Sequence, residues 1–214
     1  MDAERNRIRE MLAAGKISPE EANKRMAELD SPPATAKSLL TRPIEHLGTR
    51  QALIISTVVA VLQLVVSRLH VRFDGALDAH LSAMPVSWPQ AIIDLVLAWP
   101  VVALIFWGAA RLIAHRGEFV DLLAVVGVAR APLVVAGAVA GFLRHAFEEA
   151  TTGRANPGMI IGAILMIVLV IWFISLLVTG FRAVSRLSGA KLALTSIGAI
   201  IVAEVVTKVV LAIL

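Results

Sequence analysis

The sequence predicts an all-α, polytopic membrane protein: a five-helix transmembrane bundle that follows a short soluble helical hairpin. Three observations lead to this class. Hydrophobic residues make up 58% of the 214 positions and charged residues only 17%, against about 45–50% and about 25% in soluble domains. Five long apolar segments follow one another after residue 50, and the first 30 residues are charged throughout.

Each apolar segment is close to the roughly 20 residues that cross the hydrocarbon layer as a helix. The predicted spans are 51–67, 91–114, 120–143, 159–181 and 192–214. The first is slightly short, and the fourth contains no charge. No internal repeat is evident, and an odd number of helices argues against a two-fold repeat transporter.

Residues 1–30 predict two short helices. Apolar residues recur at helical spacing from Ile8 to Leu12, and Ser18, a proline and Glu21 form a capping-box start for the second helix. The hairpin is too short to bury a stable core alone, so we expect self-association or a protein partner there. Residues 31–50 are interpreted as a linker and juxtamembrane segment, and 51–214 as the membrane domain.

Composition excludes several function classes. The absence of cysteine removes disulfides, thiolate metal sites and cysteine nucleophiles. The net charge of +4 is not organised as basic runs interleaved with aromatics, so no nucleic-acid partner is expected. We find no nucleophile–base arrangement and no ligand spacing. We therefore expect no catalytic residues, no metal and no cofactor.

Lysine and arginine near the span ends predict the orientation, because cytoplasmic loops carry an excess of both. With the N-terminus in the cytoplasm, the inner loops hold Lys37, Arg42, Arg50, Arg111, Arg116, Arg182, Arg186 and Lys191, and the outer loops hold Arg68, Arg72, Arg144 and Arg154.

The connection 68–89 is more than a simple loop. One helical face collects the apolar residues Leu69, Phe73, Leu77, Leu81 and Met84. Much of the rest is polar, with Arg68, Arg72, Asp74, Asp78 and His80. This pattern predicts a short amphipathic helix lying in the membrane interface. The alternative is a helix packed on its own protein.

Four charged residues lie inside the spans, where unpaired charges are costly: Asp94, Arg130, Glu204 and Lys208. At 1.5 Å per residue, Arg130 and Glu204 both fall roughly 15 Å deep, near mid-span, and Asp94 and Lys208 share a shallower level. We therefore predict the pairs Arg130–Glu204 and Asp94–Lys208. Glu204 and Lys208 are also four apart on one helix. The cluster is either an ion, proton or headgroup site, or a buried clasp that fixes helix register.

Two prolines and two glycines should shape the helices. Pro100 and Pro132 lie mid-span and are expected to kink the second and third helices. Gly137 and Gly141 form a small-xxx-small step that allows close helix approach.

Two segments resemble known families. "FVDLLAVVGVARAPLVVAG" (119–137), with Gly127 and Pro132, and "WFISLLVTGFRAVSRLSGAKLAL" (172–194) resemble the Yip family of Rab-GTPase-interacting membrane proteins, in its prokaryotic branch. The resemblance covers about 40–214 and implies five spans with a cytosolic N-terminus. It departs at Arg130, where a tyrosine or apolar residue is expected.

The segment "IREMLAAGKISPEEANKRMAEL" (8–29) resembles the SHOCT-like hairpin of bacterial membrane-associated proteins, and departs from it at Arg25-Met26. That resemblance implies a protein of the prokaryotic cytoplasmic membrane and an oligomerisation or docking role for the hairpin.

The leading function is thus a non-enzymatic protein of the Yip type, acting in membrane organisation or trafficking-like processes through protein contacts. The alternative is a small transporter, channel or lipid-moving protein that uses the four charges. A third interpretation is a sensor that signals through residues 1–30. A hydrated cavity around the charges would favour transport, and a dry clasp would favour the scaffold.

Overall fold

A computed structural model describes residues 2–30, 46–145 and 157–213. It divides into two compact units, Met1–Lys37 and Ser38–Leu214, and each is described by itself. The linker predicted at 31–50 lies mostly outside the described residues, as does Arg154.

The first unit is a pair of helices, α1 (Asp2–Ala13) and α2 (Pro19–Asp30). The turn between them contains Gly15 at a φ of 65°, a conformation that favours glycine. Ser18 Oγ accepts the backbone N–H of Glu21 at 3.1 Å, which caps α2. The Glu21 carboxylate turns to Arg25 at 2.6 Å and not back toward Ser18. Half of the expected capping box is therefore formed.

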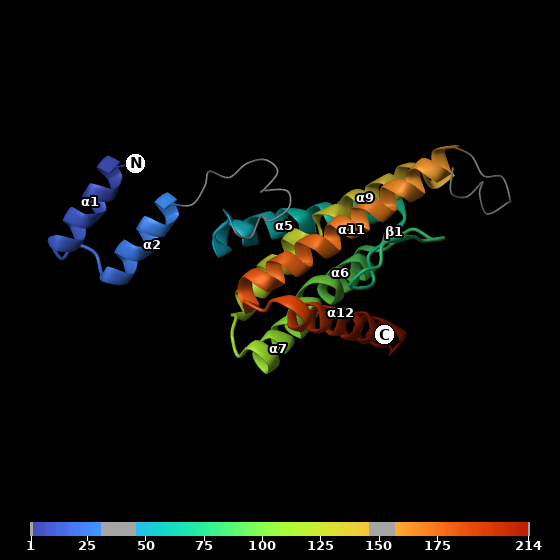
Figure 1. Cartoon of the computed structure of the whole chain (residues 1–214). Helices are drawn as coiled ribbons and strands as arrows, with labels where there is room; N and C mark the ends of the chain where they lie inside the picture. The colour runs from blue at the N-terminus through green and yellow to red at the C-terminus, as the bar shows by residue number, and fades with distance from the viewer. Residues whose placement is uncertain (1, 31–45, 146–156, 214) are drawn as a thin grey trace. The chain divides into compact units, whose positions relative to one another are not determined.

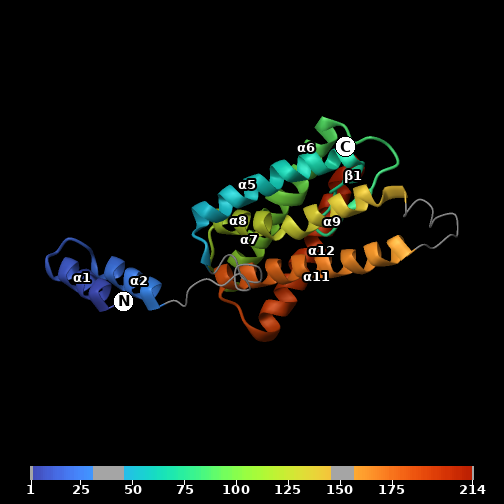
Figure 2. The same cartoon turned by 90° about the horizontal axis from the view of Figure 1, so that it is seen from above.

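The second unit contains five helices long and apolar enough to cross a membrane, as the sequence predicts (Figures 1 and 2). The first span is α5 (Thr49–Val66) with the 3-10 turn η1 (Ser67–Leu69). The second joins α6 (Trp88–Val96), the π-helical segment η2 (Leu97–Val101) and α7 (Val102–Ala114). The others are α8 (Phe119–Ala129) with α9 (Ala131–Phe142), then α11 (Pro157–Ser185) and α12 (Gly189–Ile213).

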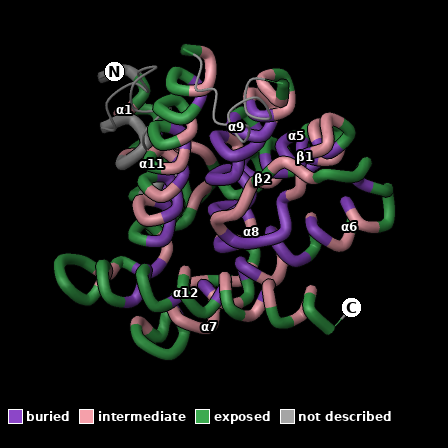
Figure 3. The backbone as a smooth tube through the Cα atoms, turned by 90° about the vertical axis from the view of Figure 1, so that its right-hand side faces the viewer, coloured by how far each residue is buried: buried purple, intermediate pink, exposed green. Residues whose placement is uncertain are grey.

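The third span is the centre of the bundle. Its hydrophobic window is 72% buried, against 22–39% for the other four, and Figure 3 shows α8 and α9 as the mostly buried strip. Gly127 lets α8 approach α5 and η2, because a Cβ there would lie 2.3 Å from Ser56 Cβ. Gly180 serves the same purpose on α11, where a Cβ would meet Val125 at 2.6 Å. Small residues thus allow the neighbouring helices to pack closely against the third span.

Both mid-span prolines coincide with interruptions of the helices. The third span breaks at Arg130, between the end of α8 and the start of α9, with Pro132 in the first turn of α9. Pro100 lies inside the π-helical segment of the second span. Since proline lacks an N–H and clashes with the preceding turn, such breaks are its usual consequence.

The segment predicted as an interfacial helix is not a helix. After η1 the chain forms strands β1 (Val71–Arg72) and β2 (His80–Leu81), which pair antiparallel with Val71 opposite Leu81. We call residues 70–87 the inter-span loop, and the end of the bundle that it covers the loop end. The opposite end, at turns 115–118 and 186–188, is called the turn end.

The amphipathic pattern led to the wrong prediction of an interfacial helix because the apolar side chains of the loop pack into the bundle. Phe73 and Val71 are fully buried, and Ala76 is 2% exposed. The β1–β2 ladder and side chains of the spans bond several of its backbone groups, among them the Leu77 N–H and the Gly75 carbonyl, in place of a helix.

Candidate functional site

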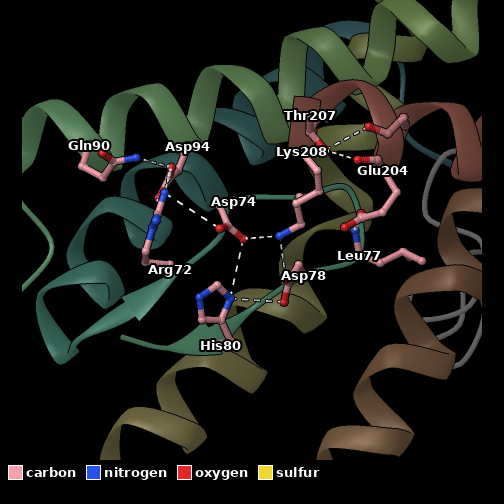
Figure 4. Close-up of polar contacts among 12 residues, drawn as sticks. Arg72, Asp74, Leu77, Asp78, His80, Gln90, Asp94, Glu204, Thr207 and Lys208 are labelled. Carbon is pink, nitrogen blue, oxygen red and sulfur yellow. Dashed lines mark hydrogen bonds and ion pairs between the residues drawn. The ribbon is translucent and has the colours of Figure 1, made fainter. Parts of the chain in front are cut away.

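The charged side chains of the spans meet the inter-span loop (Figure 4). Asp94, on α6, is 2% exposed. Its Oδ2 accepts Arg72 Nε at 3.1 Å and its Oδ1 accepts Arg72 Nη2 at 2.9 Å. Gln90, one turn earlier, donates to the same Oδ1 at 2.8 Å. This two-bond fork is the strongest geometry for an arginine–carboxylate pair.

Lys208, on α12, binds two carboxylates of the loop. Its Nζ donates to Asp74 Oδ1 at 2.9 Å and to Asp78 Oδ2 at 2.6 Å. His80 Nδ1 lies 3.6 Å from Asp74 and 3.3 Å from Asp78 on the other side. The lysine side chain is 42% exposed and that of Asp78 35%, so this contact is partly screened.

Arg130 is the largest of the nearly fully buried side chains in the described chain, at 2% exposure. Its Nε donates to Gln63 Oε1 of α5 at 3.0 Å. Its Nη1 donates to the Ala98 carbonyl in η2 at 3.0 Å and to the Gly75 carbonyl of the loop at 3.5 Å. Its Nη2 has no partner among the described residues. The break between α8 and α9 therefore places a cation where three other segments converge.

Glu204 supports the loop from α12. Its Oε2 accepts the backbone N–H of Leu77 at 3.1 Å. A Cβ on Gly75 would lie 2.7 Å from Glu204 Oε1, so glycine at position 75 lets the carboxylate approach the loop closely. Glu204 thus bonds one backbone group of the loop while Arg130 bonds another two residues away.

The predicted pairs are therefore wrong. Arg130 and Glu204 do not form a direct ion pair in the described chain, because the backbone of residues 75–77 lies between them. Asp94 binds Arg72, and Lys208 binds Asp74 and Asp78, so Asp94 and Lys208 do not pair. Glu204 and Lys208 likewise bind the loop and not each other. The estimated depth of each charged residue along its helix was used to choose the pairs, but in the structure the loop provides a hydrogen-bond partner for each of the four.

Electrostatics outside the spans follow these contacts. The hydrogen bond to Asp94 raises the pKa of Arg72 against the opposing effect of burial. Burial would raise the pKa of Asp78, but the hydrogen bond and charge of Lys208, together with His80, hold that pKa below its usual value. Both groups are therefore held in their charged forms.

Gly137 and Gly141 are sites of close approach, but the neighbour is the loop region. A Cβ on Gly137 would lie 2.5 Å from the ring of Phe73, and one on Gly141 would lie 2.7 Å from Leu69 Cβ. Their small size lets α9 receive the segment that leads into and through β1.

Among the residues that the structure describes, one group of side chains combines atoms that could bind a metal ion. Asp74, Asp78 and His80 each offer an atom within 4.8 Å of the others. The ammonium group of Lys208 already bonds both carboxylates, so the cluster has its own cation.

Sequence reasoning missed Gln63 and Gln90 as partners of the buried charges. The signal was present, because each is an amide at or near an apolar span. Arg72, Asp74, Asp78 and His80 were recognised as a polar face, but that face was assigned to a helix at the interface.

The comparison with known families agrees with this architecture. The sequence model of the Yip1 domain matches residues 21–210, which is most of the chain. The chain belongs to the Yip1 domain family. Neither a curated protein nor a solved structure matches it. The Yip1 domain match begins inside α2, earlier than the resemblance at 40–214 indicated, and it includes the whole inter-span loop.

Gly127, in the segment that resembles the Yip family, lies where the third span of this Yip1 domain packs against its neighbours. Gly127 is the contact of α8 with Ser56, whose Oγ bonds the Ala52 and Ala124 carbonyls at 2.8 and 3.1 Å. Trp99 Nε1 donates to the Leu123 carbonyl at 2.7 Å beside the same glycine. The chain is thus a multi-pass membrane protein of the Yip type, with a third span tied to its neighbours by side chain-to-backbone bonds.

Proposed function

We propose that this Yip1-domain protein is a non-enzymatic membrane protein that acts in membrane organisation or trafficking-like processes through protein contacts. The observation that carries the proposal is the closed clasp between the spans and the loop. Asp94 and Arg130, the two deepest-buried charges, are each 2% exposed and hydrogen-bonded.

Transport would use these charges differently. Ionisable groups that serve a substrate line a water-filled path. Here the fork on Asp94 holds the loop, and the bonds of Arg130 join the loop to α5 and η2. The exposed part of the cluster, Lys208 with Asp78, lies at the loop end and is neutralised by its own contact. A register-fixing clasp accounts for all four charges.

Charge placement supports a cytoplasmic N-terminus in a prokaryotic cytoplasmic membrane. Among the described residues, six lysines and arginines belong to the turn end, and they are Arg50, Arg111, Arg116, Arg182, Arg186 and Lys191. The loop end has three of the arginines assigned to the outer loops among the described residues, Arg68, Arg72 and Arg144, and Arg72 is neutralised by Asp94. By the positive-inside rule we infer that the turn end faces the cytoplasm and that the N-terminus is cytoplasmic.

The N-terminal unit, which resembles a SHOCT-like hairpin, is proposed as the contact module. Its interior rests on few apolar side chains, including Ile8 and Ala22 at 5% and 3% exposure. So small a core gains stability when it meets a partner or another copy.

The first experiment is reconstitution of the full chain in liposomes loaded with pH- and potassium-sensitive dyes. The scaffold predicts flux no higher than in protein-free liposomes, for wild type and for Glu204→Gln alike. Flux above that background, abolished by Glu204→Gln in a folded variant, would overturn the proposal in favour of transport.

The second experiment tests contacts in cells. Ala22→Asp places a charge in the small core of the N-terminal unit, and Ala14→Asp places the same charge at an exposed position. We expect Ala22→Asp to remove cross-linked complexes of the full chain and to alter membrane morphology, while Ala14→Asp preserves both. Equal behaviour of the two variants contradicts a contact role for this unit.

A further inference from the structure

An apolar groove runs between α7 and α12 on the outside of the bundle. Its volume is about 430 Å³, and its walls extend from Ile105 to Ile113 on α7 and from Leu194 to Val202 on α12. Every lining residue is apolar or glycine except Thr195. Figure 3 shows α7 and α12 side by side at the edge of the unit, where α12 is the least buried span at 22%.

The groove exists because small residues line it on both helices. Gly108 on α7 and Gly198 on α12 both face it, and a Cβ built on either would meet no atom within 4 Å. This differs from Gly127, Gly137 and Gly180, where the neighbouring side chain fills the space. The two groove glycines therefore leave room that the protein itself does not use.

The length of the groove corresponds to one leaflet of the bilayer. Eight residue steps from Ile105 to Ile113 correspond to about 12 Å along a helix, which is close to one half of a hydrocarbon layer about 30 Å thick. The groove therefore covers one leaflet and ends at mid-span. One lipid acyl chain also spans one leaflet, so its length matches that of the groove.

Charge selects the headgroup. The groove reaches the turn end, where the exposed residues Arg111, Arg116 and Lys191 lie within three residues in sequence of residues that line it. The described residues at that end include six lysines and arginines but only two carboxylates, Glu118 and Asp121, and Asp121 accepts a bond from Thr49 at 2.7 Å. Basic groups beside the bilayer attract anionic lipids.

We propose that the α7–α12 groove binds one acyl chain of an anionic phospholipid from the leaflet at the turn end, with its phosphate held by Arg116 and Lys191. The site is separate from the clasp of Asp94, Arg130, Glu204 and Lys208. The proposal does not depend on the function proposed above, because lipid binding can be measured without any assay of membrane organisation.

The test is native mass spectrometry of the full chain in detergent, titrated with dioleoyl phosphatidylglycerol or dioleoyl phosphatidylcholine. Wild type is expected to retain phosphatidylglycerol at lower lipid concentration than phosphatidylcholine. Arg116→Gln with Lys191→Gln should raise the half-saturating phosphatidylglycerol concentration about fivefold for each charge removed, and leave phosphatidylcholine unchanged. Arg50→Gln, on a helix that does not line the groove, is the control for charge.

A second variant fills the groove without crowding the protein. Gly108→Leu with Gly198→Leu should abolish tight retention of phosphatidylglycerol, and Ala163→Leu with Ala193→Leu, at exposed positions that do not line the groove, should retain it. Thermal unfolding of each variant shows whether it is folded, and the charge pair tests the site independently of the leucine pair.

Three outcomes would overturn the proposal. Equal retention of the two lipids by wild type removes the headgroup selection. Unchanged retention in the leucine pair removes the groove. Conversion of a wild-type dimer to a monomer by the leucine pair, seen by size-exclusion chromatography, assigns the groove to a second copy.

Discussion

The fork between Arg72 and Asp94 predicts an asymmetric response to mutation. Asp94 has a side chain 3% exposed and keeps only Gln90 when Arg72 is removed. Arg72 has a side chain 27% exposed and can turn to Asp74, 3.8 Å away, when Asp94 is removed. Truncating Arg72 therefore leaves the buried carboxylate of Asp94 without a cation, whereas truncating Asp94 leaves Arg72 able to bind Asp74.

The magnitudes follow from burial. Removing one partner of a buried pair destabilises a protein by about 3–5 kcal/mol, which we expect for Arg72→Ala. For Asp94→Ala we expect about 1–3 kcal/mol, the loss of hydrogen bonds to a group that water still reaches. The double variant should resemble Asp94→Ala, because the second truncation removes the stranded charge. Adding Asp94→Ala to Arg72→Ala is thus expected to restore about 2 kcal/mol.

The assay is reversible unfolding of the purified protein in mixed micelles of mild detergent and dodecyl sulfate, followed by helical circular dichroism. Arg182→Ala, an exposed arginine in the last turn of α11, controls for the loss of a positive charge. If Arg72→Ala is no more destabilising than Asp94→Ala, or if the double variant shows the sum of both effects, the fork does not hold the loop as described.

Three further predictions use other contacts of the bundle. Gly127→Ala should destabilise the fold by about 1–3 kcal/mol through overpacking against α5, whereas Gly108→Ala, with open space at its Cβ, should be neutral or slightly stabilising in the same unfolding assay. Glu204→Ala should cost about 1–3 kcal/mol because it leaves the Leu77 N–H unpaired, and Glu204→Gln, which keeps an acceptor, should cost less; equal losses would show that this bond is unimportant. The lowered pKa of Asp78 implies that its stabilisation is complete above the unfolded value of about 3.9 and is lost as pH falls through the lower folded pKa. The stability difference between wild type and Asp78→Asn should therefore be constant near neutral pH and vanish in strong acid, and the absence of any difference at neutral pH would show that the contact between Asp78 and Lys208 does not stabilise the fold.

The sequence predicted the helices well for reasons that are local. Five apolar segments of sufficient length have few alternatives to membrane-spanning helices, because unpaired backbone groups are too costly in lipid. Ser18 begins α2 because a hydroxyl there caps a free N–H. Pro132 marks a helix break for the equally local reason that it lacks an N–H.

The inter-span loop was mispredicted because its pattern is ambiguous. Phe73 lies on the apolar side of an amphipathic helical pattern, but also at a position that a short strand and loop can bury. Its actual environment is Gly137, some 64 residues later. Hydrophobic periodicity reports which side chains avoid water, and it does not report whether lipid or protein covers them.

The sequence by itself determined the number of spans, their order, the capped N-terminal hairpin and the levels at which charges lie along the helices, because each depends on neighbouring residues and on helix rise. Only the tertiary structure decided the partners of those charges. Lys208 bonds Asp74 and Asp78, more than 120 residues earlier, and Arg130 shares its donors among Gln63, Gly75 and Ala98. These contacts require a loop that inserts between helices, and a carboxylate or carbonyl binds whichever cation the packing places within about 3 Å.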